Sequence, residues 1–60
     1  MKYVISINKD TGTDKGDKGS REVEADLPGD AIEQAQGDYF SAHPGESPSD
    51  YSFRAEWHRG

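Results

Sequence analysis

Residues 21–40, REVEADLPGDAIEQAQGDYF, most constrain the fold, because a strand pattern changes into a helix pattern within this segment. Before Pro28, apolar and polar residues alternate, as in a strand with one buried face. After Asp30, apolar residues recur every three or four positions, as on one face of a helix. Proline is tolerated in the first turn of a helix but not in a central strand, so the change falls at the Pro28-Gly29-Asp30 break.

Three segments are predicted to be strands, at residues 2–8, 20–27 and 51–58, because apolar residues alternate with polar or small ones. A helix is predicted from Asp30, which caps its N-terminus with Glu33 three residues later, to Ala42. The apolar residues expected on the buried faces of these elements are Tyr3, Ile5, Ile7, Val23, Ala25, Leu27, Ala31, Ile32, Ala35, Tyr39, Ala42, Tyr51, Phe53, Ala55 and Trp57.

The order strand, strand, helix, strand predicts an α+β fold of ββαβ type, with one helix packed on one face of a three-stranded antiparallel sheet. A right-handed return through the helix brings the last strand beside the first, which favours the strand order 2-1-3. The order 1-2-3, in which the last two strands pair in parallel, is the alternative. Residues 1–60 are expected to form a single domain, with flexible loops at 9–19 and 43–50.

The chain has 60 residues, no cysteine and a net charge of −5. These properties exclude disulfides and thiolate zinc sites, and they argue against direct binding of nucleic acid, which requires a basic surface. No segment approaches the roughly 20 apolar residues of a membrane span. A cytoplasmic protein is expected, in the host cell cytoplasm if a phage encodes it. Large apolar residues are few, so the core is thin and a homodimer is a reasonable expectation.

No cofactor, metal or catalytic site is predicted. The loop at 9–19 carries Asp10, Asp14 and Asp17, but the positions where a calcium-binding EF-hand requires glycine and glutamate hold other residues. His43 and His58 lack the paired spacing of metal ligands. We therefore expect a plain solvated hairpin loop and a protein that is not an enzyme.

The segment VEADLPGDAIEQAQGDYF, with YSFRAEW after it, resembles small proteins of the DpnD/PcfM type, which phages and plasmids encode. The shared pattern is a strand ending in Val-x-Ala, an acidic helix start, then Ala-Ile, Ala and an aromatic residue. It falls on Val23, Ala25, Asp30, Ala31, Ile32, Ala35 and Tyr39. The sequence departs from it at Leu27 and Gly29. The resemblance implies a ββαβ fold and a mobile-element setting, and it carries no catalytic residues.

The preferred hypothesis is a small acidic non-enzymatic interaction module, encoded by a phage or mobile element, that binds a host or self protein. The alternative is a nucleic-acid mimic that inhibits a host defence or repair protein, which is itself basic, through an acidic sheet face. The predicted partner-binding residues are four charged residues on one face of the sheet and two aromatic residues: Glu22, Glu24, Arg54, Glu56, Phe40 and Trp57. The competing interpretations are plain solvation for the charges and core positions for Phe40 and Trp57.

Overall fold

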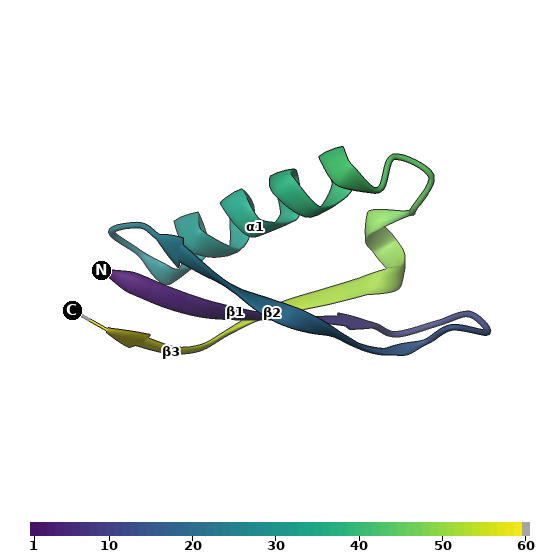
Figure 1. Ribbon diagram of the computed structural model, residues 1–60, viewed down its shortest axis with the longest axis horizontal. Coiled ribbons are helices and arrows are strands. Elements are labelled where there is room, and N and C mark those ends of the chain that lie inside the picture. The colour runs from purple at the N-terminus through teal and green to yellow at the C-terminus, as the bar shows by residue number, and fades with distance from the viewer. Residues whose placement is uncertain (60) are drawn as a thin grey trace.

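The computed structural model describes residues 1–59, and of residues 57–59 the backbone only. The chain forms β1 (Lys2–Lys9), β2 (Gly16–Glu24), α1 (Pro28–Ala42), the 3₁₀ helix η1 (Pro48–Asp50) and β3 (Tyr51–Arg59) (Figure 1). The strands make an antiparallel sheet in the order β2-β1-β3. The predicted ββαβ fold and strand order are confirmed, and the alternative order 1-2-3 is wrong.

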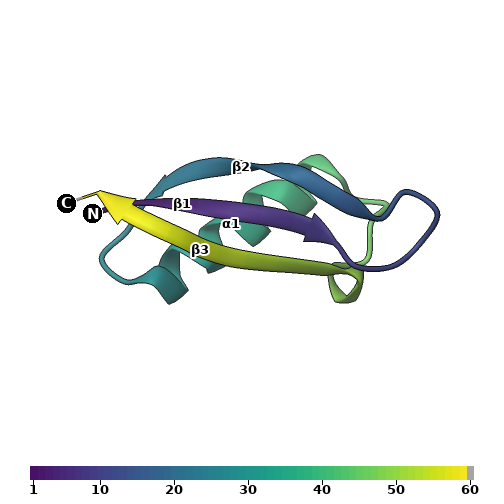
Figure 2. The same cartoon turned by 90° about the horizontal axis from the view of Figure 1, so that it is seen from below.

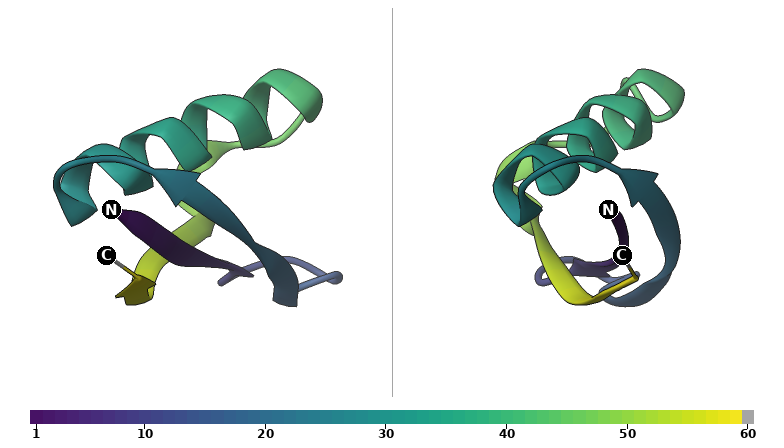
Figure 3. Two further views of the ribbon diagram at one scale, coloured as in Figure 1. Left: turned by 60° about the vertical axis from the view of Figure 1, so that its left-hand side comes forward. Right: turned by 90° about the vertical axis from the view of Figure 1, so that its left-hand side faces the viewer.

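The core lies between α1 and the central strand. Helix α1 crosses one face of the twisted sheet, and β1 runs between the two outer strands (Figures 1 and 3). The predicted alternation of β1 is confirmed, since Tyr3, Ile5 and Ile7 are buried and Ile5 is 0% exposed. Ala31 and Ala35 are also 0% exposed. Small side chains at these two positions let the helix backbone lie close to the sheet.

Strand β2 is displaced toward the N-terminus relative to the prediction, which placed it at 20–27. It begins at Gly16 and ends at Glu24, so the connection after β1 spans 10–15 instead of 9–19. The last core residue of this strand is Val23, and Leu27 is 61% exposed instead of sharing its face. The chain leaves the sheet after Glu24. The amide of Ala25 still donates to the carbonyl of Met1 at 2.9 Å.

A β-bulge interrupts β2 at Gly19. Ser6 pairs with Ser20 but Asn8 pairs with Asp17, so two residues of β2 oppose Ile7 alone. Gly19 has φ of +97°, and its amide donates to Oδ1 of Asp17 at 2.8 Å. Only glycine adopts this backbone conformation without strain. The polar residues before Gly19 can therefore join the sheet, although their sequence has no apolar alternation.

A second bulge interrupts β3 at Glu56. Val4 pairs with Trp57 while Ile5 pairs with Ala55, so Glu56 is the extra residue. The predicted single face of this strand is therefore continuous only from Tyr51 to Ala55. Opposed residues of an antiparallel pair share one side of the sheet, and a slip of one residue exchanges the sides.

The N-terminus of α1 differs from the prediction. The helix begins at Pro28, its N-cap is Leu27, and no side chain caps it by a hydrogen bond. Asp30 lies inside the first turn, so the predicted Asp30 cap is wrong. A carboxylate in the first turn is still favourable, because it faces the positive end of the helix dipole. At the other end Ala42 is exposed, contrary to its expected place on the buried face, and η1 occupies part of the loop expected at 43–50.

Candidate functional site

The open face is the side of the sheet turned away from α1. It carries the residues that alternate with the core residues, and no other described element covers it (Figure 2). The register places Glu22 opposite Val4, Glu24 opposite Lys2, and Arg54 opposite Ser6. Both glutamates and Arg54 are exposed. The register assigns to the open face Lys2, Val4, Ser6, Asn8, Asp17, Ser20, Glu22, Glu24, Ser52 and Arg54. Glu56, the extra residue of the bulge, joins them through its contact with Arg54.

The open face is acidic along β2 and mixed along β3. Neither Glu22 nor Glu24 has an ion-pair partner among the side chains that the structure describes. On β3, Nη2 of Arg54 lies 3.4 Å from Oε1 of Glu56, and these side chains are 76% and 44% exposed. An exposed ion pair of this kind contributes little stability. All four charges are therefore accessible to a partner.

A shallow pocket of about 500 Å³ lies on the open face near the β1–β2 turn. Its lining residues are Ser6, Ile7, Asn8, Asp10, Asp17, Ser52, Arg54 and Glu56. Asp10 is held there by two donors: Nδ2 of Asn8 at 2.9 Å from Oδ1, and the hydroxyl of Ser52 on Oδ2. These hydrogen bonds, the one from Ser52 first, lower the pKa of Asp10. Two hydrogen bonds therefore orient the Asp10 carboxylate in a pocket that Arg54 also lines.

Of the two predicted aromatic residues, Phe40 does not join the carboxylates of the open face. Phe40 is half-buried on the helix side of the sheet, where its ring centroid lies 5.3 Å from those of Tyr39 and Tyr51. These edge-on contacts make Phe40 part of an aromatic cluster. The backbone of Trp57 pairs with Val4, and its side chain lies outside the described residues.

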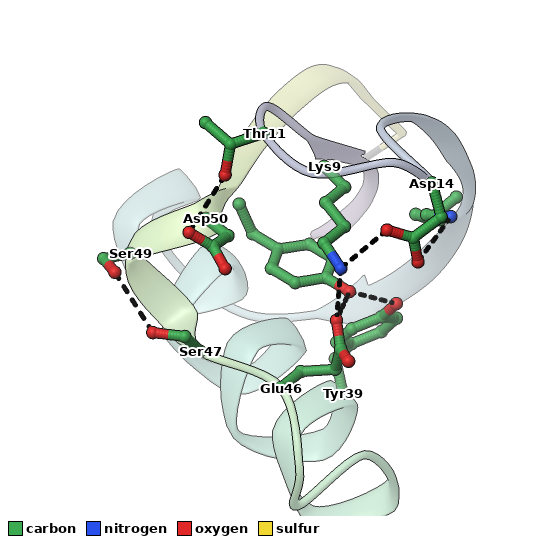
Figure 4. Close-up of polar contacts among 10 residues, drawn as sticks. Lys9, Thr11, Asp14, Tyr39, Glu46, Ser47, Ser49 and Asp50 are labelled. Atoms are coloured by element: carbon green, nitrogen blue, oxygen red, sulfur yellow. Dashed lines mark hydrogen bonds and ion pairs between the residues drawn. The ribbon is translucent and has the colours of Figure 1, made fainter.

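A polar hub that the sequence pattern did not reveal joins two loops, the ends of two strands and helix α1 (Figure 4). Nζ of Lys9 lies 2.9 Å from Oδ1 of Asp14 and 2.9 Å from Oε1 of Glu46. The hydroxyl of Tyr51 donates to the same Glu46 oxygen at 2.6 Å, and the hydroxyl of Tyr39 donates to that of Tyr51 at 3.3 Å. The Lys9 hub, as we call these five residues, ties the β1–β2 turn to the C-terminal end of α1.

The electrostatics of the Lys9 hub indicate a structural role. Hydrogen bonds from Tyr51 and then Lys9 lower the pKa of Glu46. Hydrogen bonds to Glu46 and then Asp14 raise the pKa of Lys9, and bonds with Glu46 and Tyr39 raise the pKa of Tyr51. A nucleophilic or basic lysine requires a lowered pKa, so Lys9 stays a protonated ammonium and cannot attack a substrate.

Among the residues whose side chains are described, no group of three or more His, Cys, Asp or Glu residues is arranged to hold a metal ion. Nδ1 of His43 lies 2.8 Å from the carbonyl oxygen of Tyr39, and the two rings stack with centroids 4.2 Å apart. His43 therefore closes the end of α1. The side chain of His58 lies outside the described residues.

The described helices include none that is long and apolar enough to cross a membrane. No family model, no curated protein and no solved structure matches the chain. The resemblance to proteins of the DpnD/PcfM type therefore stays a prediction.

Proposed function

We propose that this protein is a non-enzymatic interaction module that binds a basic surface of another protein through its open face. The observation that supports this most is the pair Glu22 and Glu24, two exposed carboxylates held on one strand of an uncovered sheet face without ion-pair partners in the described structure. The backbone of a strand is already ordered before binding. Binding through side chains on a strand therefore costs this protein less conformational entropy than binding through a loop.

Charge decides which partners suit this face. The net charge of −5 repels nucleic acid and attracts a basic protein surface, which it also steers during association. Arg54 and Glu56 add one charge of each sign on the opposite strand, so the face is patterned and not uniformly acidic. Such a pattern favours one orientation of the partner over others. The mobile-element setting implied by the DpnD/PcfM-type resemblance makes a cytoplasmic host protein the first class to screen.

The test compares the wild-type protein with Glu22→Lys/Glu24→Lys in affinity capture from a bacterial lysate, followed by affinity measurement with the captured protein. We expect the double reversal to weaken binding by at least roughly tenfold, with a salt-dependent association rate in the wild type. Glu33→Lys is the charge-matched control for Glu22→Lys alone, because Glu33 is an exposed carboxylate on α1. Equal binding by wild type and the double variant would refute the proposed surface.

Mapping by amide chemical shifts gives a second readout with the purified partner. Changes on binding should concentrate in β1 and β2 around Val4, Ser6 and Glu22, which lie together on the open face. Changes confined to α1 would contradict the proposal even if a partner is captured.

A nucleic-acid mimic is the second candidate function. The exposed carboxylates Glu22 and Glu24 occupy alternate positions of β2, and Asp17 lies on the same face beyond the bulge, so negative charge follows the strand as it follows a nucleic-acid backbone. The target would be a basic host defence or repair protein. If this protein competes with DNA for the captured partner, and Glu22→Lys/Glu24→Lys does not compete, the candidate is supported. If the partner binds DNA and this protein at the same time, the candidate is refuted.

A further inference from the structure

The two sides of α1 differ in how they meet the sheet. On the β2 side, Nη2 of Arg21 lies 3.7 Å from Oδ2 of Asp38, and charged groups close the junction. On the β3 side, the junction is apolar and only half-buried. We define the apolar flank as Ile32, Phe40, Tyr51, Phe53 and Ala55, all of intermediate exposure. Apolar side chains that stay half-exposed gain free energy when a partner covers them, which points to the β3 side as the place for a partner.

The residues of the apolar flank lie on one side of the helix and the adjoining strand. The Phe40 ring lies 5.3 Å from that of Tyr51 and 5.7 Å from that of Phe53, centroid to centroid. Ile32 lies seven residues before Tyr39, whose ring also meets Phe53 at 5.9 Å, so both point to the same side of α1. Ile32, Phe53 and Ala55 pack against the buried core while staying partly exposed.

The outer edge of β3 lies directly beside the apolar flank. In the order β2-β1-β3 this strand pairs on one side only, so its other side presents backbone N–H and C=O groups. Arg54 and Glu56 flank Ala55 on this strand, with exposed fractions of 76% and 44%. When two copies of this strand lie antiparallel and are centred on Ala55, the arginine of each copy lies opposite the glutamate of the other.

We propose that a second copy of this chain pairs antiparallel along the outer edge of β3, about a two-fold axis near Ala55. Arg54 of each protomer then lies opposite Glu56 of the other, which makes two equivalent ion pairs across the strands. The two sheets become one six-stranded sheet with both helices on the same side, and the Ala55 end of each apolar flank lies opposite its copy at the axis. The bulge at Glu56 adds local twist to this edge.

A second copy suits this edge better than an unrelated basic peptide. A basic strand has no counterpart for Arg54, whereas the same strand reversed satisfies Arg54 and Glu56 together. The self-association goes beyond the proposed function, because its contacts are the β3 edge and the apolar flank, not the acidic side of the open face.

Charge exchange tests the pairing. Sedimentation velocity over micromolar to millimolar concentrations should detect a dimer of the wild-type protein. Arg54→Glu places two carboxylates opposite each other and Glu56→Arg places two guanidinium groups, so each variant should raise the dimer dissociation constant about tenfold. The combined variant Arg54→Glu/Glu56→Arg restores both pairs and should dimerise like the wild type.

Matched controls separate pairing from net charge. Glu22→Arg changes the net charge by the same amount as Glu56→Arg, and Lys15→Glu by the same amount as Arg54→Glu. Glu22 and Lys15 are exposed and lie outside β3. Both controls should dimerise like the wild type. A wild type that stays monomeric, single variants that dimerise normally, or a combined variant as weak as the single ones would each overturn the proposal. These outcomes do not bear on the proposed function, which is tested separately by the loss of partner binding in Glu22→Lys/Glu24→Lys.

Discussion

The ammonium of Lys9 donates to the carboxylate of Glu46 at 2.9 Å, although 37 residues separate them in the chain. Lys9 ends β1, and Glu46 lies in the loop between α1 and η1. The contact therefore holds the return of the chain from the helix against the central strand. The Lys9 side chain is 11% exposed, which places this ion pair nearer the interior than the others in the described structure.

Replacement of Lys9 with methionine should destabilise the protein. The substitution keeps an unbranched apolar chain but leaves Glu46 and Asp14 without their shared cation. We expect the midpoint of thermal unfolding, followed by circular dichroism, to fall more than in Lys15→Met. Lys15 is an exposed lysine of the β1–β2 turn and serves as the control. Equal midpoints for the two variants would show that the Lys9 hub contributes no stability.

Stability should fall in acid because several carboxyl groups have lowered pKa values in the folded protein. For Glu46 the ordinary pKa is 4.5, and for Asp10 and Asp14 it is 3.8. Their contribution is complete above these values and is lost as the pH falls through them toward the lower folded pKa values, because the unfolded chain binds protons first.

Urea unfolding between pH 7 and pH 3 measures this dependence. The free energy of unfolding should change little down to about pH 5 and then decrease. Glu46→Gln removes one of the titrating groups, so its stability should depend less steeply on pH in the acid range. A wild-type stability that rises on acidification would contradict the lowered pKa values.

Truncation of Ile5 should unfold much of the protein. Ile5 is 0% exposed and belongs to the buried cluster under α1. Ile→Ala in a core costs about 2–5 kcal/mol and Ile→Val about 0.5–1.5 kcal/mol, while a chain of this size rarely has more than about 3–5 kcal/mol in total. Chemical denaturation should therefore find Ile5→Val folded and Ile5→Ala largely unfolded. Val4→Ala, at a half-buried position on the open face, should cost less than Ile5→Ala.

Two glycines should respond to alanine in opposite directions. Gly37 lies within α1, and a Cβ atom there meets nothing within 4 Å, so Gly37→Ala should stabilise the protein by about 1 kcal/mol. Gly19 also has open space around it, but its φ of +97° strains any other residue, so Gly19→Ala should destabilise by roughly 1 kcal/mol. Urea midpoints measure both effects. A stabilising Gly19→Ala would contradict the bulge geometry.

The charged residues of the open face were predictable from sequence, whereas the Lys9 hub was not. Glu22 and Glu24 alternate with Val23 along a strand, so their shared face follows from a period of two. Lys9, Asp14 and Glu46 lie at strand ends and in loops, where side-chain direction follows no period. The register of β1 with its two neighbouring strands decides which loops come into contact. The sequence does not specify this register in segments that have no apolar residue to mark a buried face.

Local sequence by itself determined the order strand, strand, helix, strand and the buried face of β1, because apolar periodicity and the Pro28 break act over a few residues. It also favoured the strand order 2-1-3, because a right-handed return through the helix admits few topologies. Only the tertiary structure decided the two bulges, the start of β2 at Gly16, the exposure of Leu27 and the hub around Lys9. These features arise from pairing between distant segments, where the twist of the sheet and the fit of polar groups select among registers that the sequence pattern leaves equal.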